Sequence, residues 1–359
     1  MADKRREAAR FEPAEGLTIG EACLQASSFL AGCGVSEPRE NAERLLMHAL
    51  GLDRAALLRD WREPMPAGRL AEWAAMVGRK AAGEPVQYIT GEQWFYGLPL
   101  AVSPAVLIPR PETELLVEAV LETADRLWPG RHGGAHPRVA GTPAPQPHAA
   151  DRGPARPRAG NAGTSRPHAD IDSSRSRVAD AGTARLRVAD IGTGSGAIAV
   201  TLAVQRPGWC LCATDLSPDA LAVAKANADR HGVSDRIAFI RGDLLEPFAA
   251  EGGDDRVLDI VVSNPPYIPS SDLPGLQREV RDYEPRLALD GGADGLDPYR
   301  RMTAQLQALP SAPRIVAFEV GLGQARDVAG LLDATGLWPD IRIVRDYAGI
   351  ERHVIASAP

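Results

Sequence analysis

The sequence predicts a doubly wound α/β fold with a seven-stranded sheet, preceded by a small helical bundle domain and a β-hairpin linker. Three observations lead to this prediction. From residue 187 onward, short apolar stretches alternate with segments of helical periodicity, which is typical of a mostly parallel sheet covered by helices. The first apolar stretch ends in a glycine-rich turn before a helix. Residues 17–82 instead carry helical patterns separated by turn signals.

Composition divides the chain into segments of different character. We expect a flexible N-terminus at 1–16, a helical domain at 17–85, a hairpin linker at 86–108 and the sheet domain at 109–359. Residues 130–187 are rich in Pro, Gly, Ala, Arg and Ser and nearly lack large apolar side chains, so they cannot bury enough surface to offset ordering entropy. We therefore predict a disordered insert within the sheet domain.

Helix-start signals organise the N-terminal domain. Thr18 and Glu21 form a capping box, Ser36 is placed to cap a second helix, and a third helix follows Pro66. Such a bundle can serve packing alone or can dock a macromolecule, and the sequence leaves both interpretations open. The linker is predicted from β-favouring residues around the turn signals Gly91 and Gly97.

Seven strands are expected in the C-terminal domain. Ligands of such sheets bind beyond the carboxyl ends of the parallel strands, so the residues that follow the strands are the candidates for a site. The expected strands are 187–191, 209–214, 236–241, 257–263, 313–320, 341–346 and 352–357.

Bulk composition excludes several functional classes. The formal net charge of −7 argues against a broad nucleic-acid surface, so stable nucleic-acid binding is not expected. The four cysteines form no CxxC pair, and no metal site is expected. The charged N-terminus does not resemble a signal peptide and no apolar stretch could span a bilayer, so we expect a cytoplasmic protein without a membrane partner.

The glycine-rich turn is the first candidate for a cofactor site. It consists of Gly192, Thr193, Gly194, Ser195 and Gly196, and alternate glycines allow the backbone to turn tightly against a ligand. The helix that follows presents unpaired N–H groups. The stretch also satisfies the dinucleotide pattern, so a nicotinamide enzyme remains an alternative.

Two further strands end in acidic residues. Asp215 follows the second strand, where a carboxylate accepts hydrogen bonds from ribose hydroxyls. Asp243 and Leu244 follow the third strand. Ribose is common to several cofactors and Asp243 could instead cap a turn, so these residues locate a site without naming its ligand.

The most specific motif follows the fourth strand and reads Asn264-Pro265-Pro266-Tyr267. An amide or aromatic amine nitrogen is a poor nucleophile because its lone pair is delocalised. The Asn264 side-chain oxygen and the Pro265 carbonyl can accept both N–H hydrogens and so direct the lone pair, while the prolines preorganise the acceptors. Tyr267 offers a flat face to a planar target group. A nicotinamide enzyme has no use for this element.

With this motif the chain resembles the protein-(glutamine-N5) methyltransferases of the PrmC/HemK family, which modify peptide chain release factors. The NPPY motif alone is shared with DNA adenine and RNA guanine methyltransferases, so it indicates chemistry and not substrate. More specific blocks lie at 83–91, 107–114, 283–289, 291–297 and 319–324.

The resemblance implies a class I methyltransferase fold with S-adenosylmethionine as cofactor. It implies that Asn264, Pro265, Pro266 and Tyr267 are catalytic and hold the target glutamine, which lies in the Gly-Gly-Gln motif of class I bacterial release factors. The block 107–114 would form part of the site wall. The cofactor contacts implied are Gly192, Thr193, Gly194, Ser195, Gly196, Asp215, Asp243, Leu244 and Asn264.

Two further alternatives remain at this point. The first is an amino-methyltransferase acting on adenine or guanine in DNA or rRNA, which shares the cofactor and the NPPY motif but is opposed by the acidic charge balance. The second is a non-catalytic binding protein on the same fold, which predicts a degraded motif set. Here the glycines, Asp215, Asp243 and NPPY are all intact.

Overall fold

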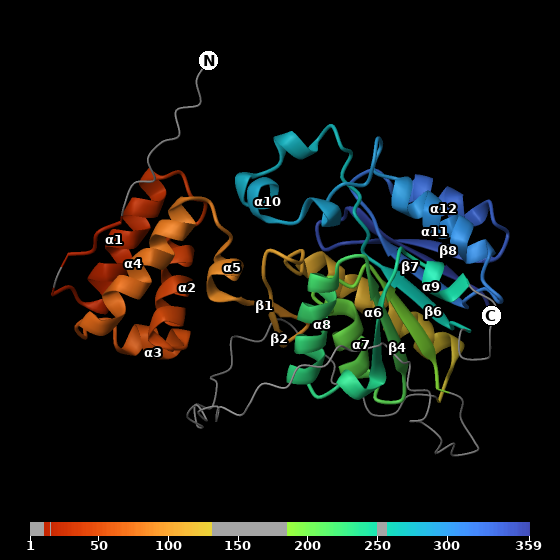
Figure 1. The fold of residues 1–359 in the computed structure, drawn as a ribbon, viewed down its shortest axis with the longest axis horizontal. Helices are drawn as coiled ribbons and strands as arrows, with labels where there is room; N and C mark the ends of the chain where they lie inside the picture. The colour runs from red at the N-terminus through yellow and green to blue at the C-terminus, as the bar shows by residue number, and fades with distance from the viewer. Residues whose placement is uncertain (1–10, 15, 131–184, 250–256) are drawn as a thin grey trace, which may run out of the picture.

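The computed structural model describes residues 11–14, 16–130, 185–249 and 257–359. Residues 131–184 of the predicted disordered insert and most of the predicted flexible N-terminus therefore lie outside the described residues, whereas Arg187, the last residue of the predicted insert, lies in a strand. The helical domain and the sheet domain lie side by side, with the linker between them (Figure 1). This arrangement is the one expected from the sequence.

Four helices build the N-terminal domain around a core that includes Leu45 and Trp73. The Thr18 hydroxyl accepts a hydrogen bond from Glu21 N at 3.2 Å, and Glu21 Oε2 accepts from Thr18 N at 2.8 Å, which confirms the capping box. The helices are α1 (Ile19–Gly32), α2 (Pro38–Leu50), the short α3 (Arg54–Arg59) and α4 (Ala67–Ala81).

Two expectations for this domain are wrong. The residue that precedes α2 is Glu37, at a φ of 51° and without a side-chain cap bond, so Ser36 does not cap that helix. Phe11 is buried, with its ring 5.0 Å from that of Phe29 and 5.3 Å from that of Trp73, so the terminus is packed at this residue and not flexible. Burial of a large aromatic ring fixes the chain there despite the polar residues around it.

The linker is a hairpin preceded by one helical turn. Strands β1 (Glu92–Phe95) and β2 (Leu98–Ala101) pair antiparallel around Gly97, as predicted. Residues Val86–Thr90 form the helix α5 although their side chains favour strands. Both Val86 and Ile89 are buried in the core of the helical domain, and this tertiary packing overrides the local preference.

The C-terminal sheet has the strand order β5-β4-β3-β6-β7-β9-β8, with the first five strands parallel and β9 antiparallel to both of its neighbours. All seven expected strands are confirmed within a few residues. They are β3 (Arg187–Ile191), β4 (Cys210–Asp215), β5 (Ile237–Arg241), β6 (Ile260–Ser263), β7 (Ile315–Glu319), β8 (Asp340–Arg345) and β9 (Glu351–Ser357).

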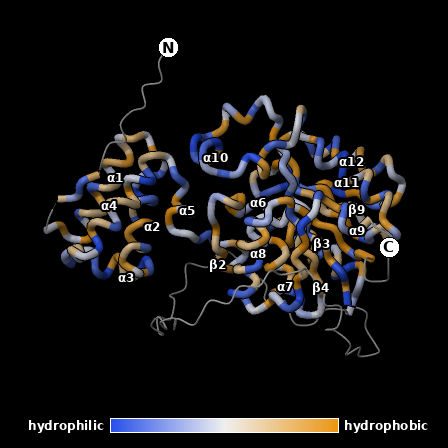
Figure 2. Tube along the Cα trace, in the orientation of Figure 1, coloured by the Kyte–Doolittle hydropathy of each residue, from blue (hydrophilic) through white to orange (hydrophobic). Residues whose placement is uncertain are grey.

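Helices cover both faces of this sheet, and hydrophobic residues, coloured orange in Figure 2, occupy the strands between them. One face carries α6 (Pro111–Leu127), α7 (Ala197–Gln205) and α8 (Pro218–Arg230). The other carries α9 (Glu246–Ala249), α11 (Asp297–Gln307) and α12 (Ala325–Asp333), while α10 (Arg278–Tyr283) lies in the connection between β6 and α11. Covered faces explain the nearly continuous apolar runs of the strands.

Candidate active site

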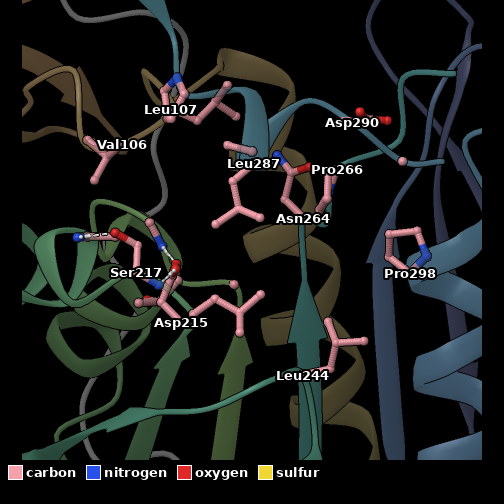
Figure 3. A pocket seen from close by; sticks show the side chains of 18 of the residues that line it. Val106, Leu107, Asp215, Ser217, Leu244, Asn264, Pro266, Leu287, Asp290 and Pro298 are labelled. Atoms are coloured by element: carbon pink, nitrogen blue, oxygen red, sulfur yellow. Dashed lines mark hydrogen bonds between the residues drawn. The ribbon is translucent and has the colours of Figure 1, made fainter. Parts of the chain in front are cut away.

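A cavity of about 550 Å³ lies beyond the carboxyl ends of the parallel strands. In Figure 3, Asp215 and Ser217 lie on one side of it, Asn264 and Pro298 lie on the other, and Val106 closes it from the linker. Of the candidate residues, those that line the cavity are Gly192, Thr193, Gly194, Ser195, Asp215, Asp243, Leu244, Asn264 and Pro266.

The glycine-rich turn needs its glycines for two different reasons. Gly192 and Gly194 have φ values of 70° and 55°, a region that side chains disfavour, and both border the cavity. Gly196, at a φ of 79°, is not among the lining residues. A Cβ there would lie 3.1 Å from the Ala224 backbone, so Gly196 allows α7 to pack closely against α8.

Asp190 shapes the turn from beneath and was not among the predicted site residues. Its Oδ2 accepts hydrogen bonds from the Thr193 hydroxyl at 2.6 Å and from Ala199 N at 3.0 Å. Burial raises the pKa of this carboxyl group to about 7, against the lowering effect of these two hydrogen bonds. Its position directly before Ile191-Gly192 was the feature of the sequence that could have indicated Asp190 as a site residue.

Asp215 is held in place by the same turn. Its Oδ2 accepts from Gly194 N at 2.9 Å, and its Oδ1 accepts from Ser217 N at 2.9 Å. Each carboxylate oxygen has two lone-pair directions, so both can accept one more hydrogen bond from a ligand hydroxyl in the cavity. Asp215 therefore has the geometry that recognition of a ribose diol requires.

Asp243 retains one acceptor without a donor. Its Oδ2 forms an ion pair with Arg301 Nη2 at 2.5 Å, while its Oδ1 is buried and has no hydrogen-bond partner among the described residues. The neighbouring Leu244 has a φ of 53°, a conformation that clusters at ligand sites in residues other than glycine.

The four residues of the NPPY motif differ in their surroundings. Asn264 and Pro266 line the cavity, whereas Pro265 is buried and Tyr267 does not border the cavity. The Tyr267 ring packs against Gly321 and the core, and burial raises the pKa of its hydroxyl group to about 12. The position of Tyr267 therefore does not support the expectation that its ring presents a flat face to a target group in the cavity.

The loop that carries the motif is fastened by the segment before α11. Ile268 N donates to Leu289 O at 3.0 Å, and Gly291 N donates to Ile268 O at 2.9 Å. Gln324 Nε2 donates to the Tyr267 carbonyl at 3.0 Å. The blocks 291–297 and 319–324, to which the sequence analysis gave no role, therefore hold the loop that carries the NPPY motif.

Further walls come from two blocks far apart in the sequence. The predicted wall block contributes Leu107, Pro109 and Arg110, and its Arg110 forms an ion pair with Glu284 at 2.5 Å. Leu287, from the block 283–289 that also contains Glu284, lines the cavity too, and sequence reasoning did not place it there. The cavity is thus closed by the linker on one side and by the segment after β6 on another.

Comparison with known proteins agrees with this architecture. Residues 21–91 match the family model of the PrmC N-terminal domain, and residues 175–275 match that of the methyltransferase small domain. A release factor glutamine methyltransferase of Geobacter sulfurreducens is 38% identical over 96% of this chain and 98% of its own length. One from Moorella thermoacetica is 38% identical over 95% and 98%, and one from Bacillus anthracis is 36% identical over 95% and 99%.

The chain belongs to the release factor glutamine methyltransferase family. Membership makes it a class I methyltransferase with S-adenosylmethionine as cofactor, which removes the nicotinamide enzyme and the non-catalytic binding protein from consideration. Among solved structures, the N-terminal domain of human METTL16 is 13% identical, covers 99% of this chain and 97% of its own, and has a TM-score of 0.46. So remote a likeness carries no argument about function.

The cavity fits this family's cofactor in its polar groups. It offers the Asp215 oxygens to a diol and the Asp243 carboxylate to an amino group, beside a turn with open backbone. In the described ranges, no cluster of three or more His, Cys, Asp or Glu side chains could hold a metal ion. Within the same ranges, no helix has the length and apolar character needed to cross a membrane.

Proposed function

We propose that this protein transfers a methyl group from S-adenosylmethionine to the N5 side-chain amide nitrogen of the glutamine in the Gly-Gly-Gln motif of class I bacterial release factors. The observation that carries the proposal is the orientation of Asn264 at the cavity wall. Its Nδ2 donates to the Thr113 hydroxyl at 3.1 Å, which leaves Oδ1 as the acceptor for an incoming N–H group. The names of the relatives support the choice of substrate.

The chain's own groups would act by holding the target amide. Asn264 Oδ1 and the Pro265 carbonyl would accept its two N–H hydrogens, and this holds the nitrogen lone pair toward the methyl group. The cofactor, when bound, supplies a methyl group already activated on a sulfonium sulfur. Because the nitrogen can lose a proton to water after the new N–C bond has formed, no strong general base is needed.

The cofactor contacts are proposed on the same geometry. The turn from Gly192 to Ser195 would face the methionine part, Asp215 the ribose, and Asp243 with Leu244 the adenine. Gly196 would act indirectly, through the packing of α7, and Tyr267 through the shape of the loop that carries Asn264.

The proposed partners are release factors, with no membrane partner and no stable nucleic-acid partner. Since release factors act on ribosomes, we propose the cytoplasm as the place of the reaction. Methylation of adenine or guanine is not favoured, because the curated relatives at 36–38% identity are named for release factor glutamine.

The test is methyl transfer from labelled S-adenosylmethionine to a purified bacterial release factor, beside a copy whose Gly-Gly-Gln glutamine is changed to alanine. We expect label on the intact copy alone. Label on both copies would move the site to another residue. Label on DNA or rRNA instead of either copy would replace the proposed substrate by a nucleic acid.

A further inference from the structure

We propose that Thr113 and Glu319 are positioning residues that fix the orientation of the Asn264 side-chain amide. The inference rests on the proposed function, because it concerns the group that would hold the target glutamine. The three residues come from three elements that meet at the sheet edge. Thr113 lies in the first turn of α6, Glu319 is the last residue of β7, and Asn264 directly follows β6.

A chain of two hydrogen bonds joins these side chains. The Thr113 hydroxyl donates to Glu319 Oε2 at 2.7 Å, and Asn264 Nδ2 donates to the Thr113 hydroxyl at 3.1 Å. Thr113 is 4% exposed and Glu319 is 2% exposed, so water does not compete for these groups. Thr113 belongs to the block 107–114 and Glu319 to the block 319–324.

The direction of each bond follows from the number of protons available. A hydroxyl group has one proton, and an ionised carboxylate has none. The Thr113 proton is committed to Glu319, so the Thr113 oxygen can only accept from Asn264. The Asn264 NH₂ group must therefore face Thr113, and its Oδ1 must face the cavity. Without Glu319, the hydroxyl could donate to Oδ1 and hold the amide in the reversed orientation.

The surroundings of Glu319 make this arrangement sensitive to pH. Burial raises the pKa of its carboxyl group to about 7, against the lowering effects of hydrogen bonds from Thr113 and Asn264. A protonated carboxyl group could donate to Thr113 and release the Thr113 proton toward Asn264. The other titratable or charged groups that face Glu319 from neighbouring elements are Glu112 of α6, Tyr267 after β6, Tyr299 of α11, and Arg352 and His353 of β9.

Two of these groups have a defined proton state. The His353 Nε2 lies 4.0 Å from Glu319 Oε2 and 3.0 Å from Glu112 O, and burial lowers the pKa of this imidazole to about 4. His353 is therefore neutral near pH 7 and donates to the Glu112 carbonyl. Tyr299 donates its hydroxyl proton to the Glu319 carbonyl oxygen at 2.7 Å. The carboxylate proton is thus the one that changes near neutral pH.

Kinetic measurements on Thr113 variants test the positioning role. Thr113→Val keeps the shape of the side chain and removes the hydroxyl, and we expect kcat to fall by about 10- to 100-fold. The KM for the release factor and the dissociation constant of the cofactor should stay within about twofold, because Thr113 is 4% exposed and its hydroxyl is already bonded to Glu319 and Asn264. Thr113→Ser, which restores the hydroxyl, should recover most of kcat.

The same helix offers a matched control. Thr123 of α6 is 1% exposed, and its hydroxyl accepts a hydrogen bond from Arg342 Nη2 at 2.8 Å. Thr123→Val makes the same chemical change away from the cavity and should leave kcat unchanged. A kcat for Thr113→Val equal to that of Thr123→Val would overturn the inference, as would failure of Thr113→Ser to recover activity.

A spectroscopic measurement separates the inference from the proposed function. The side-chain NH₂ signals of Asn264 can be assigned by their absence in Asn264→Asp and followed in protein labelled at asparagine nitrogen. We expect them to shift in Thr113→Val and Glu319→Gln but not in Thr123→Val, and to titrate near pH 7 in the unmodified protein. Unchanged signals in both variants would refute the positioning role, whether or not the protein methylates a release factor. A wild-type protein without transferase activity would refute the proposed function alone.

Discussion

The ammonium group of Lys80 lies 2.6 Å from the Glu279 carboxylate and joins the end of α4 to α10. The Lys80 side chain is 1% exposed and that of Glu279 is 38% exposed. A second contact nearby is the hydrogen bond from the Tyr283 hydroxyl to Ala82 O at 3.1 Å. The helical domain is thus fastened to the segment that leads from α10 to the cavity wall.

Breaking this ion pair should loosen that segment. In Glu279→Ala a buried ammonium group loses its partner, and we expect the free energy of unfolding to fall by about 1–3 kcal/mol, reduced by the access of water to the site. Hydrogen exchange of α10 should become faster. Urea titration and hydrogen exchange by mass spectrometry would measure the two effects.

Two controls accompany the Glu279 variant. Arg281→Ala on the same helix removes an exposed pair with Asp282 and should cost less than about 1 kcal/mol. Lys80→Met added to Glu279→Ala should recover stability, because no unpaired buried charge remains. Equal losses for Arg281→Ala and Glu279→Ala would contradict the importance of the interdomain pair.

Asn264→Ala should remove turnover and spare the cofactor. The variant lacks the acceptor proposed for the target amide, so kcat should fall by about 10²- to 10³-fold, as for loss of one preorganised hydrogen-bonding group at a reacting centre. Calorimetric titration should give a cofactor dissociation constant within a few-fold of the unmodified protein. Normal turnover would show that Asn264 does not hold the target.

Asp215→Ala should weaken cofactor binding first. It loses the carboxylate that receives Gly194 N and Ser217 N, together with the proposed bond to the ribose, and we expect the dissociation constant to rise by about 10- to 100-fold. Asp219→Ala is the matched control, because Asp219 is exposed in the first turn of α8 and does not line the cavity. Equal constants for the two variants would remove Asp215 from the cofactor site.

Gly295 should be intolerant of any side chain. It has a φ of 79°, and a Cβ there would overlap the Tyr267 carbonyl oxygen and the Gln324 amide. Gly295→Ala should therefore displace the loop that carries Asn264 and lower kcat by about tenfold or more. Gly336→Ala provides the comparison, since Gly336 has a φ of 68° with open space around its Cα.

Comparing Gly295→Ala with Gly336→Ala separates the effect of backbone strain from the effect of steric overlap. Gly336→Ala should lose about 1–2 kcal/mol of stability through the left-handed backbone alone and keep its kcat. Thermal unfolding and steady-state kinetics on both variants would measure this. If Gly295→Ala retains full kcat, the close packing of residues 291–297 against the NPPY loop has no catalytic consequence.

Glu319 should make stability depend on pH in a defined direction. Burial raises the pKa of its carboxyl group to about 7 from the ordinary value of 4.5, so between these values the folded protein holds a proton that the unfolded chain has lost. Stability contributed by this proton is present at low pH and is lost as pH rises through 7. The side chain introduced in Glu319→Gln does not titrate, so this variant does not lose that stability. Its free energy of unfolding should therefore rise relative to that of the unmodified protein as the pH is raised from 5.5 to 8.

Urea titrations at the two pH values would measure this difference. Glu63→Gln makes the same change at an exposed position and is the control. A stability difference between Glu319→Gln and the unmodified protein that stays constant from pH 5.5 to pH 8 would contradict the raised pKa of Glu319.

The sequence by itself determined the positions of the strands along the chain and the place of the cavity. Period-two and period-3.6 patterns, caps and glycine turns are local signals, so the seven strands and the turn at Gly192 could be read from neighbouring residues. The positions of Asp215 and Asn264 followed, because parallel strands carry their carboxyl ends to one edge.

Only the tertiary structure decided which residues meet there. The bonds from Thr113 to Asn264 and to Glu319 span 151 and 206 positions, and no local pattern encodes such a distance. Packing also turned Val86–Thr90 into a helix, placed Tyr267 outside the cavity lining and assigned Gly196 to the contact with α8. Each of these outcomes depends on which side chains are buried against one another in the folded protein. Residues that are neighbours in the sequence do not determine this.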